Sequence, residues 1–304
     1  MKIIPLKDLK LKGMYKNKGG EIMKEAMYYE NLKDKEVNCQ LCPHYCKIPL
    51  GEVGKCRVRK NIDGSLYSLN YGKITSYAYD RIEKKPLFHF YPGKRIFSIG
   101  SFGCNLSCSF CQNWQIAHGE PLSIEISDRD ILTLAKAKES IGIAYTYNEP
   151  SIWYEYVLHL SKLAKKEGLV NVLVTNGFIN PEPLEELLPY IDGMNIDLKS
   201  LSNDFYKDIC KGRLSPVLKT IERSVKSTHV EVTTLLIEGK NTTLEEIETI
   251  AKTIASIDKD IPLHLSRYFP AYKMDNPETK VETVFAARDM AKKYLNNVYT
   301  GNIF

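Results

Sequence analysis

Short apolar stretches alternate with longer amphipathic ones from Arg95 onward. The short stretches have the length and composition of buried strands, and the longer ones repeat apolar residues with a helical period. We expect strands at residues 95–101, 142–147, 170–175, 191–198, 229–237 and 261–266. Residues 151–167 predict one helix, whose buried face would hold Ile152, Tyr156, Val157, Leu160, Leu163 and Ala164.

A second helix is predicted over residues 242–256. It would begin with Thr242 and Glu245 as a capping-box pair. Its apolar face would hold Leu244, Ile247, Ile250, Ala251 and Ile254.

These alternations favour parallel strands covered by helices, because each connection is long enough to cross back over the sheet. A complete TIM barrel needs eight such units, and only six are evident. The pattern therefore predicts an α/β fold, a partial TIM-like β/α barrel that is open and has about six strands.

The first part of the chain follows a different pattern. Residues 65–79 are rich in Tyr, Leu, Ser and Thr around Gly72, which predicts a β-hairpin or two short strands. A linker-like stretch with Pro86, Pro92 and Gly93 follows. We therefore predict a small cysteine-rich, metal-binding N-terminal region with this hairpin at 1–85, and the barrel at 86–304.

The composition is that of a soluble globular protein, with 43% hydrophobic and 26% charged residues. The chain has no apolar run of roughly 18 residues, so we expect no membrane span. Residues 1–18 mix lysines with short apolar pieces and lack the apolar core of a secretory signal. We expect a cytoplasmic protein, in which dense cysteines indicate metal ligands or redox groups.

Positive charge is concentrated at the N-terminus. Residues 1–60 contain 14 Lys and Arg against 7 Asp and Glu, a net charge of +7. Because the whole chain has a net charge of +5, the remaining residues have −2. This charge distribution does not fit a uniformly basic protein that coats nucleic acid. The basic N-terminal end is nevertheless able to attract an acidic partner.

Three cysteines with the spacing C-x3-C-x2-C follow the first barrel strand. Cys104, Cys108 and Cys111 lack a local fourth partner, whereas an iron–sulfur cluster usually has four thiolate ligands. Three ligands leave one metal position open for a substrate or cofactor. Gly103 would relieve crowding around the site. The alternative is three buried cysteines without a metal.

Four further cysteines lie close together in the N-terminal region. Cys39, Cys42, Cys46 and Cys56 form a complete ligand set, which predicts a closed site holding zinc or a second iron–sulfur cluster. Their spacing matches neither a zinc ribbon nor a bacterial ferredoxin. His44 is an alternative ligand or a packing residue. The eighth cysteine, Cys210, is predicted to be unligated.

The three-cysteine motif, with Phe110 before its last cysteine, resembles the signature of radical S-adenosylmethionine (SAM) enzymes. The resemblance implies a 4Fe–4S cluster whose open iron binds SAM. Reduction by one electron then gives methionine and a 5′-deoxyadenosyl radical, which abstracts hydrogen from an unidentified substrate that we expect to be macromolecular. The cofactor carries the difficult chemistry and the protein positions it.

Other strand ends resemble cofactor-binding motifs of the branch that activates glycyl-radical enzymes. Tyr147 and Asn148 stand where that family has glycines, so Glu149 matches better than its neighbours. Carboxylates suit the ammonium and ribose of SAM, and a lysine suits its carboxylate. Alternatively, Asn176 belongs to a turn, Asp197 caps a helix and His264 is a core residue. The cofactor-binding residues implied are Phe110, Asn148, Glu149, Thr175, Asn176, Asp197, Lys199 and His264.

Longer motifs resemble the AmmeMemoRadiSam system radical SAM enzymes, relatives of pyruvate formate-lyase-activating enzymes. These motifs are C-x-L-C-P-H-x-C, G-x-x-G-x-C-x-V-R, I-E-K-K-P-L-x-H-F-Y-P-G and G-C-N-x-x-C-x-x-C-Q-N-W. The match runs from about Ala26 to Asn302, and Arg81 departs from it by replacing a usual proline.

The resemblance implies an electron donor such as flavodoxin or ferredoxin. It also implies a protein substrate or Memo-like or AMMECR-like partners, with nucleic acid as a further possibility and no membrane. Two other functions compete with this one. A non-catalytic iron–sulfur electron-transfer protein would not need the cofactor-binding residues. A zinc-stabilised interaction protein would leave Cys104, Cys108 and Cys111 unexplained.

Overall fold

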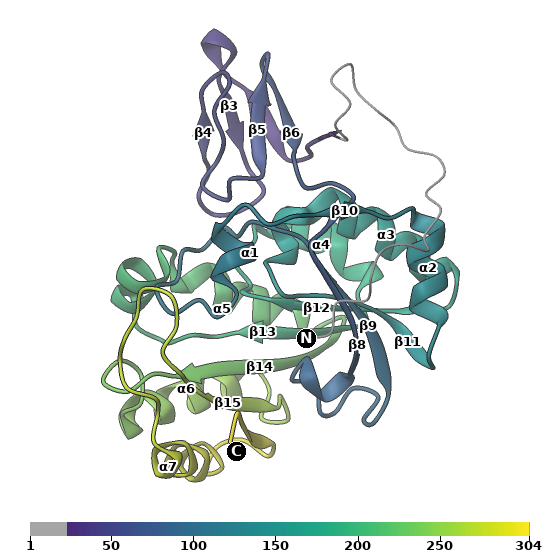
Figure 1. Cartoon of the computed structure of the whole chain (residues 1–304). Coiled ribbons are helices and arrows are strands. Elements are labelled where there is room, and N and C mark those ends of the chain that lie inside the picture. Colours follow the sequence, from purple (N-terminus) through teal and green to yellow (C-terminus); the bar gives the residue numbers. More distant parts are fainter. Residues whose placement is uncertain (1–22, 304) are drawn as a thin grey trace.

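A large sheet covered by helices forms most of the protein, and a small lobe of short strands stands at one side of it (Figure 1). This architecture comes from a computed structural model, which describes residues 23–303. Residues 1–22, which carry part of the predicted basic N-terminal region, and Phe304 lie outside the described residues.

The large sheet confirms the partial barrel. All six predicted strands form and run parallel in chain order. They are β9 (Arg95–Gly100), β11 (Ser140–Tyr145), β12 (Val170–Thr175), β13 (Gly193–Asp197), β14 (His229–Leu236) and β15 (Leu263–Arg267). The prediction missed two edge strands. β16 (Val298–Gly301) pairs in parallel with β15, and β8 (Ser76–Arg81) pairs antiparallel with β9, which makes eight strands.

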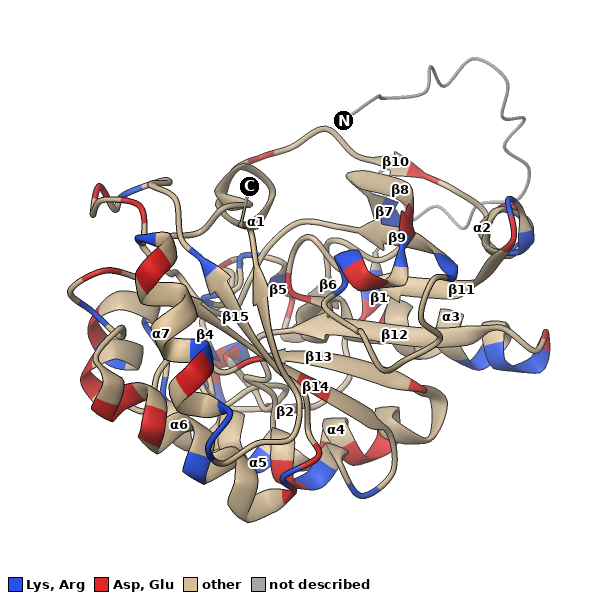
Figure 2. Cartoon of the chain, turned by 90° about the horizontal axis from the view of Figure 1, so that it is seen from below, with Lys and Arg blue, Asp and Glu red and all other residues tan. Residues whose placement is uncertain are grey.

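Helices lie between successive strands in the chain. They are α1 (Trp114–His118), α2 (Asp128–Lys136), α3 (Tyr154–Lys166), α4 (Pro181–Leu187), α5 (Leu214–Ser224), α6 (Leu244–Ile257) and α7 (Val281–Ala291). Short 3-10 turns occur at Lys33–Lys35, Ile82–Lys84, Pro150–Trp153 and Leu188–Tyr190, and a π-helix spans Phe205–Cys210. Lys, Arg, Asp and Glu residues occur mainly on helices and loops, while the central strands contain few of them (Figure 2). The core therefore lies between the sheet and these helices.

The predicted capping box of α6 is displaced by one residue. Thr243, not Thr242, caps the helix by accepting a hydrogen bond from the Glu246 amide at 3.2 Å. The Glu246 carboxylate accepts from Ser200 Oγ instead of returning to the cap. Leu244 is 44% exposed, so its predicted burial was wrong, because helix α6 begins only there.

The small lobe contains two three-stranded sheets. One joins β1 (Lys24–Glu25), β6 (Ser65–Ser68) and β5 (Arg59–Ile62), and the other joins β2 (Tyr29–Asn31), β3 (Val37–Cys39) and β4 (Lys47–Ile48). The hairpin in the first sheet turns at Asp63 and Gly64, both with positive φ, a favoured two-residue turn.

Of the two alternatives predicted for residues 65–79, the hairpin does not form, whereas short strands do. The strands in this stretch instead find partners elsewhere: β6 pairs with β5, β7 (Lys73–Ile74) with β10 (Ile124–Glu125), and β8 with β9. The predicted N-terminal region, which ends at residue 85, therefore includes β8, a strand that belongs to the large sheet. No helix among residues 23–303 is both long and apolar enough to cross a membrane.

Candidate functional site

A cavity of about 270 Å³ lies at the carboxyl ends of the parallel strands, where barrels place their active sites. All three cysteines of the C-x3-C-x2-C motif line it. So do seven of the eight predicted cofactor-binding residues, namely Phe110, Asn148, Glu149, Thr175, Asn176, Asp197 and Lys199. Residues from five parallel strands, β11 to β15, or from the loops that directly follow them, thus meet the cysteine loop in one place.

The cysteine loop begins with a tight backbone turn. Gly103 has φ +87°, and a Cβ there would lie 2.6 Å from Val58 Cγ1, so a larger residue would clash with the small lobe. The next residue, Cys104, accepts a hydrogen bond on its sulfur from the Leu106 amide at 3.4 Å. Burial raises the pKa of Cys111 to about 11 and that of Cys104 well above its usual value. Metal binding here would therefore release protons.

Two asparagines hold the cysteine loop against the strands. Asn148 accepts from the Ser101 amide at 2.8 Å and donates to the Phe102 and Gly103 carbonyls at 3.2 Å. Asn176 donates to Cys104 Sγ at 3.6 Å and to Asn105 Oδ1 at 2.9 Å. Both asparagines therefore position the cysteine ligands.

Glu149 is buried and organises the loop after β12. Its carboxylate accepts from Thr175 Oγ1 at 2.6 Å, the Asn176 amide at 2.8 Å and the Ser151 amide at 2.9 Å. Burial raises its pKa, although these hydrogen bonds oppose the shift. The carboxylate thus has donors on both oxygens within the protein.

Tyr147 stands where the resembled motif has a glycine, and its backbone lies in a region that glycine favours. Its φ is +72°, in the left-handed region. The side chain is anchored by a 3.0 Å hydrogen bond from its hydroxyl to Asp80 Oδ2.

Asp197 and Lys199 form an ion pair at the cavity wall. Lys199 Nζ lies 2.8 Å from Asp197 Oδ2 and 5.7 Å from the centre of the Phe110 ring. Burial lowers the pKa of Lys199, but the Asp197 carboxylate and the nearby Cys108 and Cys210 sulfurs raise it well above its usual value. Lys199 is therefore a fixed positive charge beside the cysteines.

His264 is the one predicted cofactor-binding residue that does not line the cavity. Its Nε2 lies 2.6 Å from the buried carboxylate of Glu231, and its ring packs 4.7 Å from Phe88. Ser266, two residues later on the same face of β15, lines the cavity instead. The sequence pattern of β15 correctly predicted which face of the strand points inward, but it did not show how far along the strand the cavity lies.

Sequence reasoning also missed several small polar residues in the cavity. Thr146, Thr233 and Ser266 contribute hydroxyl groups, and Gln112 and Asn113 extend the cysteine loop. Gln112 and Asn113 belong to the quoted G-C-N-x-x-C-x-x-C-Q-N-W motif but were not predicted to line the site. Thr146, Thr233 and Ser266 belong to none of the quoted motifs, so only the inward face of each strand could have indicated them.

The first cysteine block gathers in the small lobe. Cys39, Cys42 and Cys56 are buried and Cys46 is half-buried, and the Cys39 amide donates to the Cys46 carbonyl at 2.9 Å. The pKa of Cys42 is raised by burial and then by the charges of the other three sulfurs. Among residues 23–303, no three Cys, His, Asp or Glu side chains are arranged to hold a metal ion as they stand.

His44 joins this lobe to the cysteine loop. Its Nε2 lies 2.7 Å from the carbonyl oxygen of Asn105, and its ring packs 5.0 Å from that of Phe178. Burial lowers the pKa of His44. His44, which lies within the first cysteine block, thus contacts Asn105, which directly follows Cys104.

Cys210 lies beside the three-cysteine loop. It is fully buried at the end of the π-helix, and its carbonyl accepts from the Ser107 amide at 2.9 Å. A hydrogen bond with the Cys210 thiol is the main cause of the raised pKa of Cys108, ahead of burial.

Residues 98–254, from β9 into α6, match the family model of the Radical SAM superfamily. The chain belongs to the radical SAM superfamily. An uncharacterized protein of Methanocaldococcus jannaschii is 43% identical to this radical SAM protein over 92% of the chain and 86% of its own length.

Relatives with informative names are more distant. A protein of the same organism, named as a glycyl-radical enzyme activating enzyme, is 31% identical over 68% of the chain and 89% of its own length. The pyruvate formate-lyase-activating enzyme of Clostridium pasteurianum is 29% identical over 52% of the chain and 69% of its own length. The radical SAM protein therefore has relatives among the activating enzymes.

Solved structures agree on the fold. Streptococcus suis SuiB has a TM-score of 0.55 with 16% identity, over 67% of this chain and 48% of its own. A radical SAM methyltransferase from Sphaerobacter thermophilus has a TM-score of 0.55 with 15% identity, over 69% and 67%. The fold is thus shared with both of these solved structures.

Proposed function

We propose that this radical SAM protein binds a 4Fe–4S cluster through Cys104, Cys108 and Cys111 and abstracts hydrogen from a macromolecular substrate, with a glycyl residue of a partner protein as the first candidate. The observation that carries the proposal is the single cavity in which three thiols lie with polar groups from five parallel strands, β11 to β15, or from the loops that directly follow them. When bound and reduced, the cluster supplies the electron that breaks the C5′–S bond of SAM, which yields methionine and a 5′-deoxyadenosyl radical.

The residues of the cavity suit the polar groups of SAM. Lys199, held protonated, would bind the cofactor's carboxylate, and Asp197 would accept from its ammonium or ribose hydroxyls. Phe110 forms an apolar wall beside them. Glu149 would act indirectly, because both of its oxygens already accept hydrogen bonds from the protein. It holds Thr175 and Asn176 where they reach the cavity.

A second metal site in the small lobe is part of the proposal. Cys39, Cys42, Cys46 and Cys56 supply four thiols in a buried environment, enough to bind zinc or an iron–sulfur cluster without leaving an open position. His44 faces Asn105 rather than these sulfurs, which supports an all-cysteine ligand set.

The activating-enzyme relatives support a protein substrate and an external one-electron donor such as flavodoxin or ferredoxin. The quoted motifs support the assignment to the AmmeMemoRadiSam system, with Memo-like or AMMECR-like proteins as partners. All eight cysteines are free, which suits a reducing compartment such as the cytoplasm. A purely electron-transferring protein would have no use for the Asp197–Lys199 pair beside its cluster.

The test is SAM cleavage after anaerobic reconstitution with iron and sulfide and reduction by dithionite. We expect 5′-deoxyadenosine from the wild-type protein and none above background from Cys108→Ala. The same variant should keep the metal of the first cysteine block, where about four irons would indicate a cluster and one zinc ion a structural site. Equal product from both proteins would contradict the proposal.

A further inference from the structure

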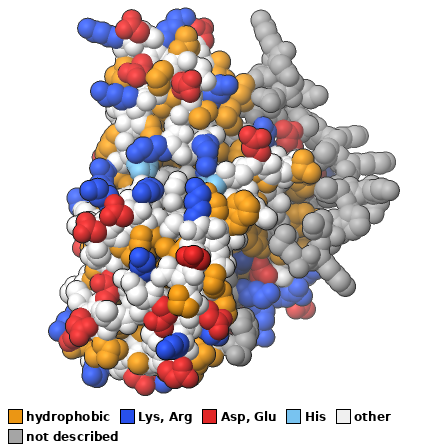
Figure 3. All heavy atoms as spheres, turned by 60° about the vertical axis from the view of Figure 1, so that its left-hand side comes forward, with side chains coloured by type: hydrophobic (Ala, Val, Ile, Leu, Met, Phe, Trp, Pro, Cys, Tyr) orange, Lys and Arg blue, Asp and Glu red, His pale blue; other side chains and the backbone are white. Residues whose placement is uncertain are grey.

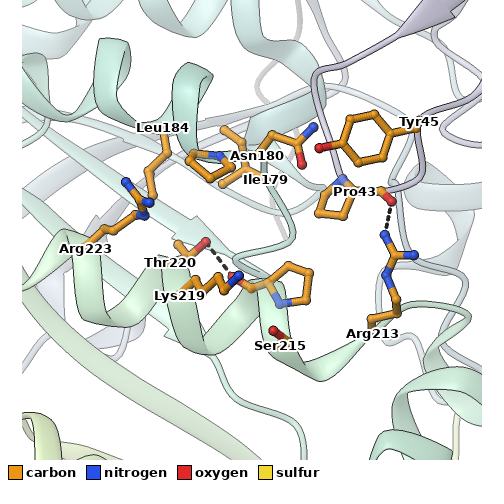
Figure 4. Close-up of a pocket in the computed structure, with 12 residues that line it drawn as sticks. Pro43, Tyr45, Ile179, Asn180, Leu184, Arg213, Ser215, Lys219, Thr220 and Arg223 are labelled. Atoms are coloured by element: carbon orange, nitrogen blue, oxygen red, sulfur yellow. Dashed lines mark hydrogen bonds between the residues drawn. The ribbon is translucent and has the colours of Figure 1, made fainter.

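A groove of about 260 Å³ lies between the small lobe and the outer helices α4 and α5 (Figure 4). Tyr45, half exposed, stands at its rim on the lobe side. Its floor is largely apolar, formed by Pro43, Ile179, Pro181, Leu184 and Pro216. Among the described residues, none that lines this groove also lines the cavity at the strand ends.

Cationic side chains surround the apolar floor. Arg213 donates to the Pro43 carbonyl, which ties α5 to the lobe, and Arg223 pairs with Glu185. Within residues 23–303, Lys219 has no ion-pair partner. Arg223 also lines an adjoining hollow of about 340 Å³ together with Lys226 and Glu185, so a second lysine follows the groove past the end of α5. On the face drawn in Figure 3, Lys and Arg side chains also gather where the lobe meets the barrel.

The groove is flanked by both cysteine sites. On one side, Pro43 directly follows Cys42 and Tyr45 directly precedes Cys46. On the other side, Thr220 donates to the Gly177 carbonyl at 2.7 Å, and the neighbouring Asn176 donates to Cys104 Sγ. A molecule bound in the groove would therefore contact segments that carry or support ligands of both sites.

We propose that this groove docks an acidic, one-electron carrier protein that reduces the cluster. This inference rests on the proposed function, which needs an external electron. The transfer moves one electron from the reduced carrier to the cluster and neither forms nor breaks a bond. The cations around the groove complement an acidic surface, and the apolar floor suits protein side chains.

Two other occupants fit the groove less well. A nucleic acid would need a longer run of cations and exposed aromatic platforms, whereas the floor here is proline, leucine and isoleucine. A hydrogen-donating substrate must enter the separate cavity, so it has no need of this groove.

The test uses the full-length, reconstituted protein and the double charge reversal Lys219→Glu with Arg223→Glu. Binding of an oxidised acidic flavodoxin and of an oxidised acidic ferredoxin is measured by calorimetry at low salt. For at least one carrier we expect the double variant to bind about tenfold more weakly and added salt to weaken the wild-type complex. Lys292→Glu with Lys293→Glu, exposed beyond α7, is the matched control and should bind like the wild type.

A second measurement separates docking from catalysis. SAM cleavage driven by the reduced carrier should fall about tenfold in the double variant, while cleavage driven by dithionite stays unchanged. An equal fall with dithionite, no binding of either carrier, or tighter binding of a mixed-sequence RNA would each overturn the docking proposal. If the wild type cleaves no SAM even with dithionite, the proposed function fails, and the binding measurement still decides the groove.

Discussion

The side-chain amide of Asn176 donates a hydrogen bond to the sulfur of Cys104 at 3.6 Å. These residues lie 72 positions apart in the chain, on the loops that follow β12 and β9. A donor aimed at a thiolate stabilises negative charge on that sulfur, so this loop is placed to tune a cluster bound there.

Asn176→Ala should lower the reduction potential of the reconstituted cluster, and Asn176→Asp should lower it further. Alanine removes the donor, and aspartate adds a negative charge that disfavours the reduced state. The potential is measured by redox titration followed by electron paramagnetic resonance, with iron content as the control. Unchanged midpoints in both variants would show that this hydrogen bond is structural only.

Arg59 and Glu155 form a buried ion pair between the small lobe and α3. Arg59 also donates to the Met27 carbonyl at 2.8 Å and to Cys39 Sγ at 3.8 Å. Removing one partner leaves a buried charge, so Arg59→Met or Glu155→Gln should each lower the free energy of unfolding by about 3–5 kcal/mol.

The double variant Arg59→Met with Glu155→Gln is the control for that pair. It should lose less stability than the two single losses added together, because no unpaired charge remains. Urea unfolding of the four proteins measures the coupling. Additive losses would contradict an energetic link between the lobe and the barrel.

Glu231 should make stability depend on pH in the acid range. Burial raises the pKa of its carboxyl, but hydrogen bonds from His229, His264 and the Phe88 and His89 amides lower it to about 2. The folded-state pKa is below the ordinary 4.5, so the stabilisation is complete above about pH 4.5 and is lost as pH falls toward 2.

The change in the free energy of unfolding is on the order of 3 kcal/mol, because the pKa of Glu231 falls from 4.5 to about 2 on folding. Chemical unfolding of the wild type at pH 7, 5, 4 and 3 should show the decline, and Glu231→Gln should be less stable at pH 7 with a flatter acid limb. Glu222→Gln, exposed on α5, serves as the control and should follow the wild-type curve.

Cys210→Ser should leave the iron content unchanged although Cys210 lies beside Cys108. Its buried position at the end of the π-helix makes it a neighbour of the proposed cluster site, and that three-cysteine site would need an open position for SAM. Iron analysis after reconstitution tests this prediction. A loss of about one quarter or more of the bound iron relative to wild type would instead identify Cys210 as a ligand.

The local pattern of apolar residues predicted where the barrel strands lie, but it did not predict which strand β8 pairs with. All six apolar stretches became parallel strands, because a buried strand needs apolar residues on both faces. β8 lies in a stretch predicted as a hairpin or two short strands, because a half-buried pattern does not distinguish a hairpin strand from the edge strand of a larger sheet. The cap of α6 was misplaced by one residue because two adjacent threonines offer the same side chain.

The sequence by itself determined the chemistry: two cysteine sets with different spacings, a repeated strand–helix pattern, and polar residues at strand ends. Only the tertiary structure decided which of these residues meet. It brought Asn176 to Cys104 and His44 to Asn105, sent His264 to Glu231 below the cavity, and formed the groove between α5 and the lobe. Spacing along the chain is local, whereas these contacts depend on sheet order, register and depth within the barrel.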